Sequence, residues 1–255
     1  MGYVFAISMQ KGGVGKTTTV QNVGTNLSKM GARVLLVDLD PQANLTQGLG
    51  VNLEQLDYSV YEVLLNPQRG PAFATLATGA GPDLVPSTLA LAGAELELAG
   101  KVGRELLLKG ALAKVVDRYD YILLDSPPNL GLFTLNVLAA AHRVLVPLQL
   151  HVYAYKALPQ LEETMVLVQQ LNPDLAIGGV MCTMFDARTN LSKSVERQVR
   201  AKYGDLVFQT VIPLNTKLAE SPAAGEPISM YDPDGAGAVA YAKLTREVVA
   251  RYGFR

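Results

Sequence analysis

The sequence predicts a single α/β domain built on a mostly parallel, twisted sheet with helices on both faces. Apolar segments of strand length alternate with helical segments along the whole chain of 255 residues. These strands are nearly continuous apolar runs, which is typical of strands that helices cover on both faces. A chain of this length can bury a substantial core, and we expect residues 1–255 to fold as one domain.

The first half of the chain begins with an apolar strand at 3–8, a glycine-rich turn and a helix. The apolar side chains of that helix recur every three or four residues and end before Gly31, where a helix would stop. A second strand covers 34–37. The remaining elements are a helix at 59–65, a short strand at 83–86, a helix at 104–116 and a strand at 121–125. The Gly/Pro-rich stretch 70–86 indicates a surface connection.

The second half continues the alternation of helix and strand. In the helix at 191–203 we expect Leu191, Val195 and Val199 to face inward, and in the last helix Val239, Leu244, Val248 and Tyr252. The predicted elements are helices at 132–141, 155–171, 191–203 and 235–252, and strands at 143–148, 175–185 and 207–212. Because strands and helices alternate, the sheet should be parallel.

Composition narrows the classes of function. Charged residues make up 18% and hydrophobic residues 49%, with a formal net charge of −1, so nucleic-acid binding would need a local basic patch. One cysteine, Cys182, lies in an apolar run and is expected to be a small core residue, which excludes an internal disulfide. No apolar stretch approaches membrane-spanning length and no leader is evident, so we expect a cytoplasmic protein.

The turn after the first strand has the residues of a phosphate-binding loop. Its glycines would let backbone N–H groups surround phosphates at the N-terminus of a helix. Lys16 should reach the β- and γ-phosphates, and the Thr17 hydroxyl should bind Mg²⁺. Two positions depart from a simple loop, since Gln10 replaces the usual first glycine and Lys11 adds a second lysine. The nucleotide contacts are expected from Gly12, Gly13, Val14, Gly15, Lys16, Thr17 and Thr18.

Aspartates end two other strands at the same edge of the predicted sheet. Open parallel sheets bind ligands beyond the C-terminal ends of their strands. Asp125 is placed to hold magnesium through a water. Of Asp38 and Asp40, one could organise the metal shell and the other the attacking water. Because phosphoryl transfer depends mainly on positioning and charge neutralisation, slow hydrolysis is expected.

Three segments together resemble the ParA family of partition ATPases, which carry a deviant form of this phosphate loop and a P-loop NTPase fold. They are residues 11–18, 37–42 and 124–128, and segments at 185–191, 212–215 and 219–228 agree with them. The resemblance implies that two subunits enclose ATP and Mg²⁺, with Lys11 reaching the partner's phosphates. It also implies that Asp40 positions the hydrolytic water and that Pro213 and Asn215 hold the adenine.

The same resemblance implies a function in segregating a chromosome or plasmid. Such ATPases bind chromosomal DNA non-specifically as ATP dimers and hydrolyse ATP when a ParB-like centromere-binding protein stimulates them, so the protein should associate with the nucleoid. A basic patch in this sequence fits the DNA contact. Its residues are Arg188, Lys193, Arg197, Arg200 and Lys202, and the resemblance adds Lys217.

Some positions depart from the family pattern. Met9 stands where relatives often have Asn, and Leu214 and Lys217 stand where they often have Arg. The short segment before the first strand predicts neither an N-terminal helix-turn-helix domain nor a basic N-terminal tail.

Three other functions are alternatives to the interpretation as a partition ATPase. A MinD-like regulator of division-site placement would bind membrane through a C-terminal amphipathic helix, whereas the helix ending near Tyr252 continues a predicted core helix. An iron–sulfur carrier would need more thiolates than one cysteine supplies. An ATP-binding scaffold without turnover would have the same sequence features.

Overall fold

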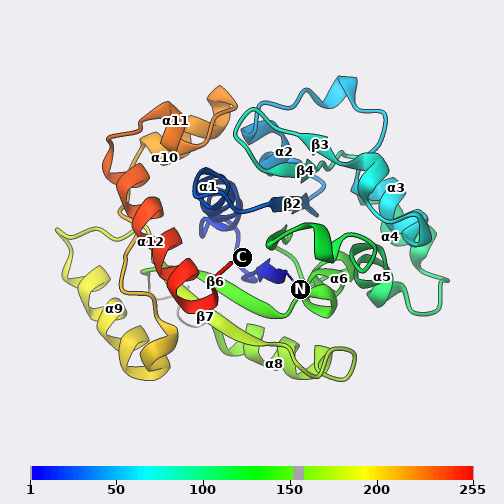
Figure 1. Ribbon diagram of the computed structural model, residues 1–255. Coiled ribbons are helices and arrows are strands. Elements are labelled where there is room, and N and C mark those ends of the chain that lie inside the picture. Colours follow the sequence, from blue (N-terminus) through cyan, green and yellow to red (C-terminus); the bar gives the residue numbers. More distant parts are fainter. Residues whose placement is uncertain (1, 152–157, 255) are drawn as a thin grey trace.

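The computed structural model describes residues 2–151 and 158–254, which form a three-layer α/β/α structure around one sheet (Figure 1). The strand order is β3-β4-β2-β5-β1-β6-β7. All neighbouring strands are parallel except β3 and β4, which are antiparallel. The strands are β1 (Tyr3–Ile7), β2 (Val34–Asp38), β3 (Leu76–Ala77), β4 (Asp83–Val85), β5 (Tyr121–Asp125), β6 (Arg143–Gln149) and β7 (Ala176–Thr183).

The helices cover the sheet in two groups. One face packs against α1 (Lys16–Lys29), α2 (Asn44–Gly48), α11 (Ile228–Tyr231) and α12 (Ala236–Tyr252). The other packs against α3 (Val60–Leu65), α4 (Leu91–Leu98), α5 (Leu107–Leu112), α6 (Leu132–Ala140), α8 (Leu158–Val168) and α9 (Asn190–Tyr203). The short α10 (Lys217–Glu220) precedes α11. No helix in the described part of the chain is long and apolar enough to span a bilayer.

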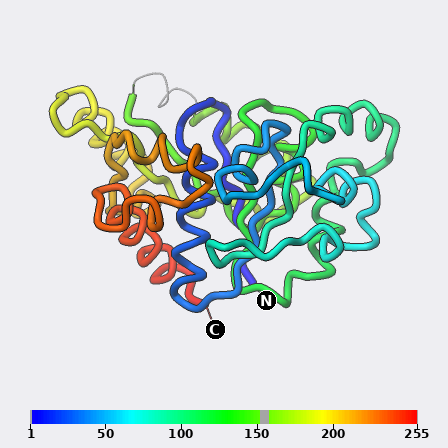
Figure 2. Tube along the Cα trace, turned by 90° about the horizontal axis from the view of Figure 1, so that it is seen from above, coloured from blue at the N-terminus to red at the C-terminus, as the bar shows by residue number. Residues whose placement is uncertain are grey.

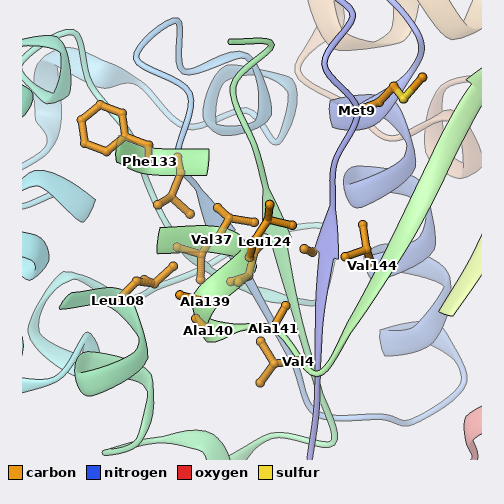
Figure 3. Close-up of a cluster of buried hydrophobic side chains, with 14 of the residues drawn as sticks. Val4, Met9, Val37, Leu108, Leu124, Phe133, Ala139, Ala140, Ala141 and Val144 are labelled. Atoms are coloured by element: carbon orange, nitrogen blue, oxygen red, sulfur yellow. The ribbon is translucent and has the colours of Figure 1, made fainter. Parts of the chain in front are cut away.

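Alternation along the strands places successive side chains in different cores. Val4 and Ala6 belong to the core under α6, whereas Phe5 and Ile7 belong to the core under α1 and α12. Figure 3 shows the first core, where Val4, Val37 and Leu124 of the strands lie among side chains from α5 and α6. The central strands are therefore anchored on both faces, and their C-terminal ends are held in fixed positions.

The ends of the helices follow from local sequence. Gly15 and Gly31, both at φ +93°, stand just before and just after α1. Ser59 and Glu62 form a capping box at the start of α3. The two ends of the chain meet on the side opposite the phosphate loop (Figure 2), where the rings of Tyr3 and Tyr252 are 5.1 Å apart.

The predicted strand at 207–212 is wrong. The segment lies beside β7, but only isolated bridges such as Val180 with Val207 form. The Glu247 carboxylate accepts the backbone N–H groups of Gln209 and Thr210, at 2.6 and 2.8 Å. Because a side chain of α12 takes these donors, no continuous ladder can form.

Two predicted helices have different limits in the structure. Residues 104–116 are interrupted, with a 3₁₀ turn at Arg104–Leu106, α5 over Leu107–Leu112, and another turn at Val116–Arg118. The predicted helix 155–171 ends at Val168, and its first three residues lie outside the described ranges. The stretch 70–86 was expected to be a surface connection with a short strand at 83–86. That strand forms as β4, and the stretch also contributes β3, which was not predicted.

Two side chains expected to face inward are exposed. Val239 is 44% exposed because it lies about 180° around α12 from the buried Val248. Leu191 is 43% exposed because the buried face of α9 is centred on Ser192, Val195, Val199 and Tyr203, about 85° away.

Candidate nucleotide-binding site

The glycine-rich loop joins β1 to α1 at the C-terminal edge of the sheet, as predicted. Gly13 and Gly15 have φ values of +70° and +93°, which side chains with a Cβ rarely adopt. The loop is also fixed from β7, two strands away from β1, since the hydroxyl of Thr183 at the end of β7 donates to the Val14 carbonyl at 2.9 Å. The loop backbone is thus held in shape, with Lys16 at the first position of α1.

Lys16 is a buried cation, only 7% exposed. Its ammonium donates to the carbonyl of Lys11 in the same loop at 3.2 Å. Burial lowers the pKa of Lys16, while the carboxylates of Asp125 and Asp40 oppose that effect. A buried ammonium beside these groups is well placed to neutralise an added anion.

Asp125 ends β5 with a fully buried carboxylate. Within the described residues, neither of its oxygens has a hydrogen-bond partner. Burial raises the pKa of Asp125 well above its usual range, the charge of Asp38 raises it further, and Thr17 and Lys16 offset part of the rise. An unpaired buried carboxylate beside a threonine hydroxyl is costly unless a cation binds there, so these residues fit Mg²⁺.

Asp38 lies opposite Asp125 in the β2–β5 register, but its oxygens are occupied. Oδ2 accepts the backbone N–H and the hydroxyl of Thr46, at 2.9 and 2.7 Å, and Oδ1 accepts the N–H of Asp40 at 3.1 Å. Burial raises the pKa of Asp38 to about 6, against these hydrogen bonds. Asp38 therefore holds α2 and the Asp40 backbone in place beside the predicted metal position.

Asp40 faces an open cavity of about 560 Å³ in front of the loop. The cavity is lined by Gly12, Gly13, Gly15, Lys16, Thr17, Thr18, Asp40, Gln42, Asn44, Gln47, Pro128, Pro222 and Ala223. Most of these residues come from the predicted loop and from the segment after β2. Pro222 and Ala223 were not predicted, because they reach the site only through the packing of the last third of the chain.

A second cavity of about 170 Å³ adjoins the first and shares Gly15 and Thr18 with it. Pro213 and Asn215 line it, as expected for residues that hold a base, and so do Met184 and Tyr241. Met184 has φ +53°, a strained value for a residue with a side chain, and strain of this kind is common at binding sites. Elongated ligands with an anionic end and a flat end would fit the two cavities together.

The predicted basic residues do not form one uniform surface. Lys193 and Arg197 are exposed, one turn apart on α9, with no ion pair among the described residues. The exposed Arg188 pairs with Asp186 at 2.9 Å, Lys202 with Glu162 at 3.5 Å, and Lys217 with Glu220 at 2.9 Å.

Arg200 has a different environment from the other basic residues. It pairs with Glu196 at 2.9 Å and also donates to the carbonyls of Phe208 and Gln209, at 3.2 and 3.1 Å. The Arg200 guanidinium thus attaches α9 to the segment that follows it.

Cys182 is fully buried in β7, and burial raises the pKa of its thiol to about 12. The prediction of a core cysteine is confirmed. Among the described residues, no group of three or more His, Cys, Asp and Glu side chains is arranged to hold a metal ion by protein ligands alone. A metal at Asp125 would need ligands from phosphate and water, as Mg²⁺ commonly has.

Comparisons with known proteins agree with this geometry. A family model described as "AAA domain" matches residues 2–177. The chain is 47% identical over 251 residues to the sporulation initiation inhibitor protein Soj of Bacillus subtilis, covering 98% of this chain and 99% of that one. It is 46% identical over 258 residues to the chromosome-partitioning ATPase Soj of Treponema pallidum, covering all of both.

Solved structures with the same fold include nucleotide complexes. A Mycobacterium smegmatis protein described as cobyrinic acid a,c-diamide synthase, with bound ADP and magnesium, has a TM-score of 0.85 and 40% identity over 99% of this chain and 96% of its own. The cell-division ATPase MinD of Pyrococcus furiosus, at 24% identity and a TM-score of 0.81 over 98% and 99% of the two chains, shares the fold.

Proposed function

This chain belongs to the Soj/ParA family of chromosome-partitioning ATPases, and from that premise we propose that it segregates DNA through an ATP-dependent dimer that binds DNA non-specifically. It is an ATPase, with ATP and Mg²⁺ as cofactors. We propose further that residues 1–255 act as one domain, that the protein works in the cytoplasm at the nucleoid, and that a ParB-like protein stimulates hydrolysis. The cargo would be a chromosome or a plasmid.

The buried Asp125 carboxylate is the observation that carries the nucleotide site. Thr17, Asp38 and Asp125 would hold Mg²⁺, Asp38 by fixing the surrounding backbone and Asp125 through a water. Bound Mg²⁺ neutralises charge on the phosphates. Lys16 and the N–H groups of residues 12–18 would bind the phosphates, and Pro213 and Asn215 would hold the adenine beside Met184.

Asp40 would orient the attacking water. It lines the same cavity as Lys16, and its Oδ1 accepts the backbone N–H of Gln42 at 2.9 Å, which orients the carboxylate. Lys11 would reach the phosphates of the partner subunit, where a second cation adds to the stabilisation of the transition state. Self-association would then depend on the bound nucleotide.

The DNA contact would centre on Lys193 and Arg197, the cations of the predicted patch that form no ion pair with residues 2–151 and 158–254. Arg188 and Lys217 would join them when DNA phosphates compete for their present carboxylate partners. Such a surface neutralises phosphates and reads no bases, so its affinity should fall steeply with salt.

A MinD-like membrane function is less well supported. Its anchor would be the C-terminal helix, yet Leu244 and Val248 of α12 are fully buried, and the Tyr252 hydroxyl donates to the Gly178 carbonyl at 2.7 Å. A helix held in this way has no free apolar face to insert into lipid. Co-sedimentation with anionic vesicles in the presence of ATP should therefore leave the protein in the supernatant.

A titration of DNA binding with ATP, ADP or no nucleotide, at two salt concentrations, tests the proposal. Binding should be tight with ATP, weak in the other two states, and weaker at the higher salt concentration. Lys16→Ala should remove the ATP dependence because the phosphates lose their cation. Equal binding in all three nucleotide states would contradict the proposed switch.

A further inference from the structure

Of the two residues that distinguish this phosphate loop from an ordinary one, Lys11 contacts β6 and Gln10 contacts α8. The Lys11 ammonium donates to Oε1 of Gln149, the last residue of β6, at 3.1 Å. Nε2 of Gln10 donates to Oγ1 of Thr164 in α8 at 2.6 Å. Within the described chain, neither Gln10 nor Lys11 lines the cavity in front of the loop. Both side chains are therefore directed away from the phosphate site of their own subunit.

Gln10 fixes the start of the loop. Thr164 is 4% exposed and itself donates to the carbonyl of Gln160 at 2.9 Å, so its hydroxyl has a set orientation. A glycine at position 10 could make no such contact with α8. Because the backbone at this position is held, a change in the direction of Lys11 must come mainly from its own side chain.

We propose that Gln149 is a positioning residue that holds Lys11 in its own subunit until a nucleotide-loaded partner arrives; this rests on the proposed ATP dimer. A hydrogen bond from an ammonium to an amide oxygen is stronger than one between neutral groups. Lys11 must break this bond before it can reach the partner's phosphates. Gln149 therefore opposes dimer formation and sets the protein concentration at which dimers appear.

The first test replaces the acceptor without changing the size of the side chain much. Gln149→Met removes the amide, and Gln149→Asn shortens it beyond reach of Lys11. Both variants should form ATP dimers at a protein concentration about threefold to tenfold lower than wild type, in light scattering or sedimentation. Gln170→Met, at an exposed glutamine two residues after the end of α8 and away from Gln149, should match wild type. If both Gln149 variants dimerise at the same protein concentration as wild type, or at a higher one, the inference is overturned.

A second test examines the bond itself in the nucleotide-free protein. Urea unfolding of Lys11→Met, Gln149→Met and the double variant should show non-additive losses of stability, because either single change already removes the bond. Additive losses overturn the inference. A wild-type protein that stays monomeric with ATP overturns the proposed dimer and this inference together, whereas a wild-type dimer with unaffected Gln149 variants overturns the inference alone.

Discussion

At the level of single residues, the buried carboxylate of Asp125 has no hydrogen-bond partner in the part of the chain that the structure describes. Stability and function make opposite demands on such a group. In the folded protein without ligand, ionising this buried carboxyl group is costly, yet the ionised group is the one that would hold the cation accompanying the nucleotide. A residue selected only for stability would be neutral at this position.

Asp125→Asn should therefore stabilise the nucleotide-free protein, by about 1 to 3 kcal/mol, because it removes a buried charge that Thr17 and Lys16 compensate only in part. The same change should abolish the contribution of Mg²⁺ to nucleotide binding. Urea unfolding without ligand and nucleotide titration with and without Mg²⁺ measure the two effects. Asp234→Asn, at an exposed aspartate, is the matched control and should change neither. A destabilised Asp125→Asn variant would contradict the assignment.

The raised pKa of Asp38 predicts how the stability of the protein depends on pH. Its pKa is raised from 3.8 to about 6 by burial, so the folded protein holds this proton more tightly than the unfolded chain does. The stabilisation is fully present below pH 4 and is lost as pH rises through 6, an effect on the order of 3 kcal/mol. The side chain in Asp38→Asn does not titrate, so the free energy of unfolding of this variant does not fall in this way. In urea unfolding, the difference in free energy of unfolding between wild type and Asp38→Asn should therefore be smaller at pH 7 than at pH 4. A deficit that stays constant with pH would show that the carboxyl does not titrate in this range.

At the level of elements, α9 separates basic residues that serve the fold from those left free to bind a ligand. Arg200 is held by three oxygen atoms, whereas Lys193 and Arg197 are exposed. Spacing alone could not distinguish them, because all three face away from the buried Val195 and Val199. The segment after α9 brings the carbonyls of Phe208 and Gln209 to Arg200 and not to Lys193 or Arg197. This path of the chain distinguishes Arg200 from the other two residues.

Lys193→Glu with Arg197→Glu should weaken DNA binding by the ATP-loaded protein and reduce the slope of log affinity against log salt by about two. Its thermal stability should stay close to wild type, since both side chains are exposed. Lys109→Glu with Lys114→Glu makes the same change in charge at α5, far from α9 (Figure 1), and should leave DNA binding intact. If both double variants weaken binding equally, net charge rather than α9 is responsible.

Arg200→Glu should behave differently from the exposed pair. It should cost about 1 to 3 kcal/mol of stability in urea unfolding, because the carbonyls of the buried Phe208 and the exposed Gln209 lose their donor and Glu196 gains a like charge. Arg188→Glu, at a side chain 85% exposed, is the matched control and should change stability little. A stable Arg200→Glu variant would show that the contacts of Arg200 do not hold the segment.

The sequence predicted most elements because their signals are local. The parallel strands are continuous apolar runs, and glycines mark both ends of α1, so β1, β2, β5 and β6 were all found. The error at 207–212 arose because its apolar residues do lie beside β7, while side chains distant in sequence take the backbone donors. The helices α2, α4, α10 and α11 were also not predicted. They are short or weakly amphipathic, so their sequences carry little local signal and tertiary packing stabilises them.

The sequence predicted the part of the candidate site that has local signals and missed the part that depends on tertiary packing. The loop residues and the strand-end aspartates could be predicted, since parallel strands bring their C-terminal ends together. Pro222, Ala223 and Met184 could not, because the segments 219–228 and 185–191 pointed to the family without showing which of their residues, or of those beside them, reach the ligand. Gln149 did carry a signal, as a polar residue ending an apolar strand at the same edge as Asp38 and Asp125.

At the level of the whole molecule, one ligand site joins segments from both ends of the chain. MgATP should therefore slow hydrogen exchange in residues 12–18 and in 213–223, while the opposite rim at Gly253 and Phe254 should be unaffected. Exchange followed by mass spectrometry with ATP and without it makes the comparison, and Lys16→Ala is the control that should lose both effects. Protection confined to 12–18 would contradict the placement of the base.

The residues that line the two cavities come from distant parts of the sequence, so they are synthesised at different times. A chain emerging from the ribosome makes the loop and both strand-end aspartates early, but it lacks Pro213, Asn215 and Tyr241 until about 200 more residues have been added to the loop. Until then the growing polypeptide can contact phosphates but has no wall against which a base can rest. Full occupancy by ATP would thus require residues 213–241 to be present, and a fragment cut short before residue 213 should not form the proposed dimer.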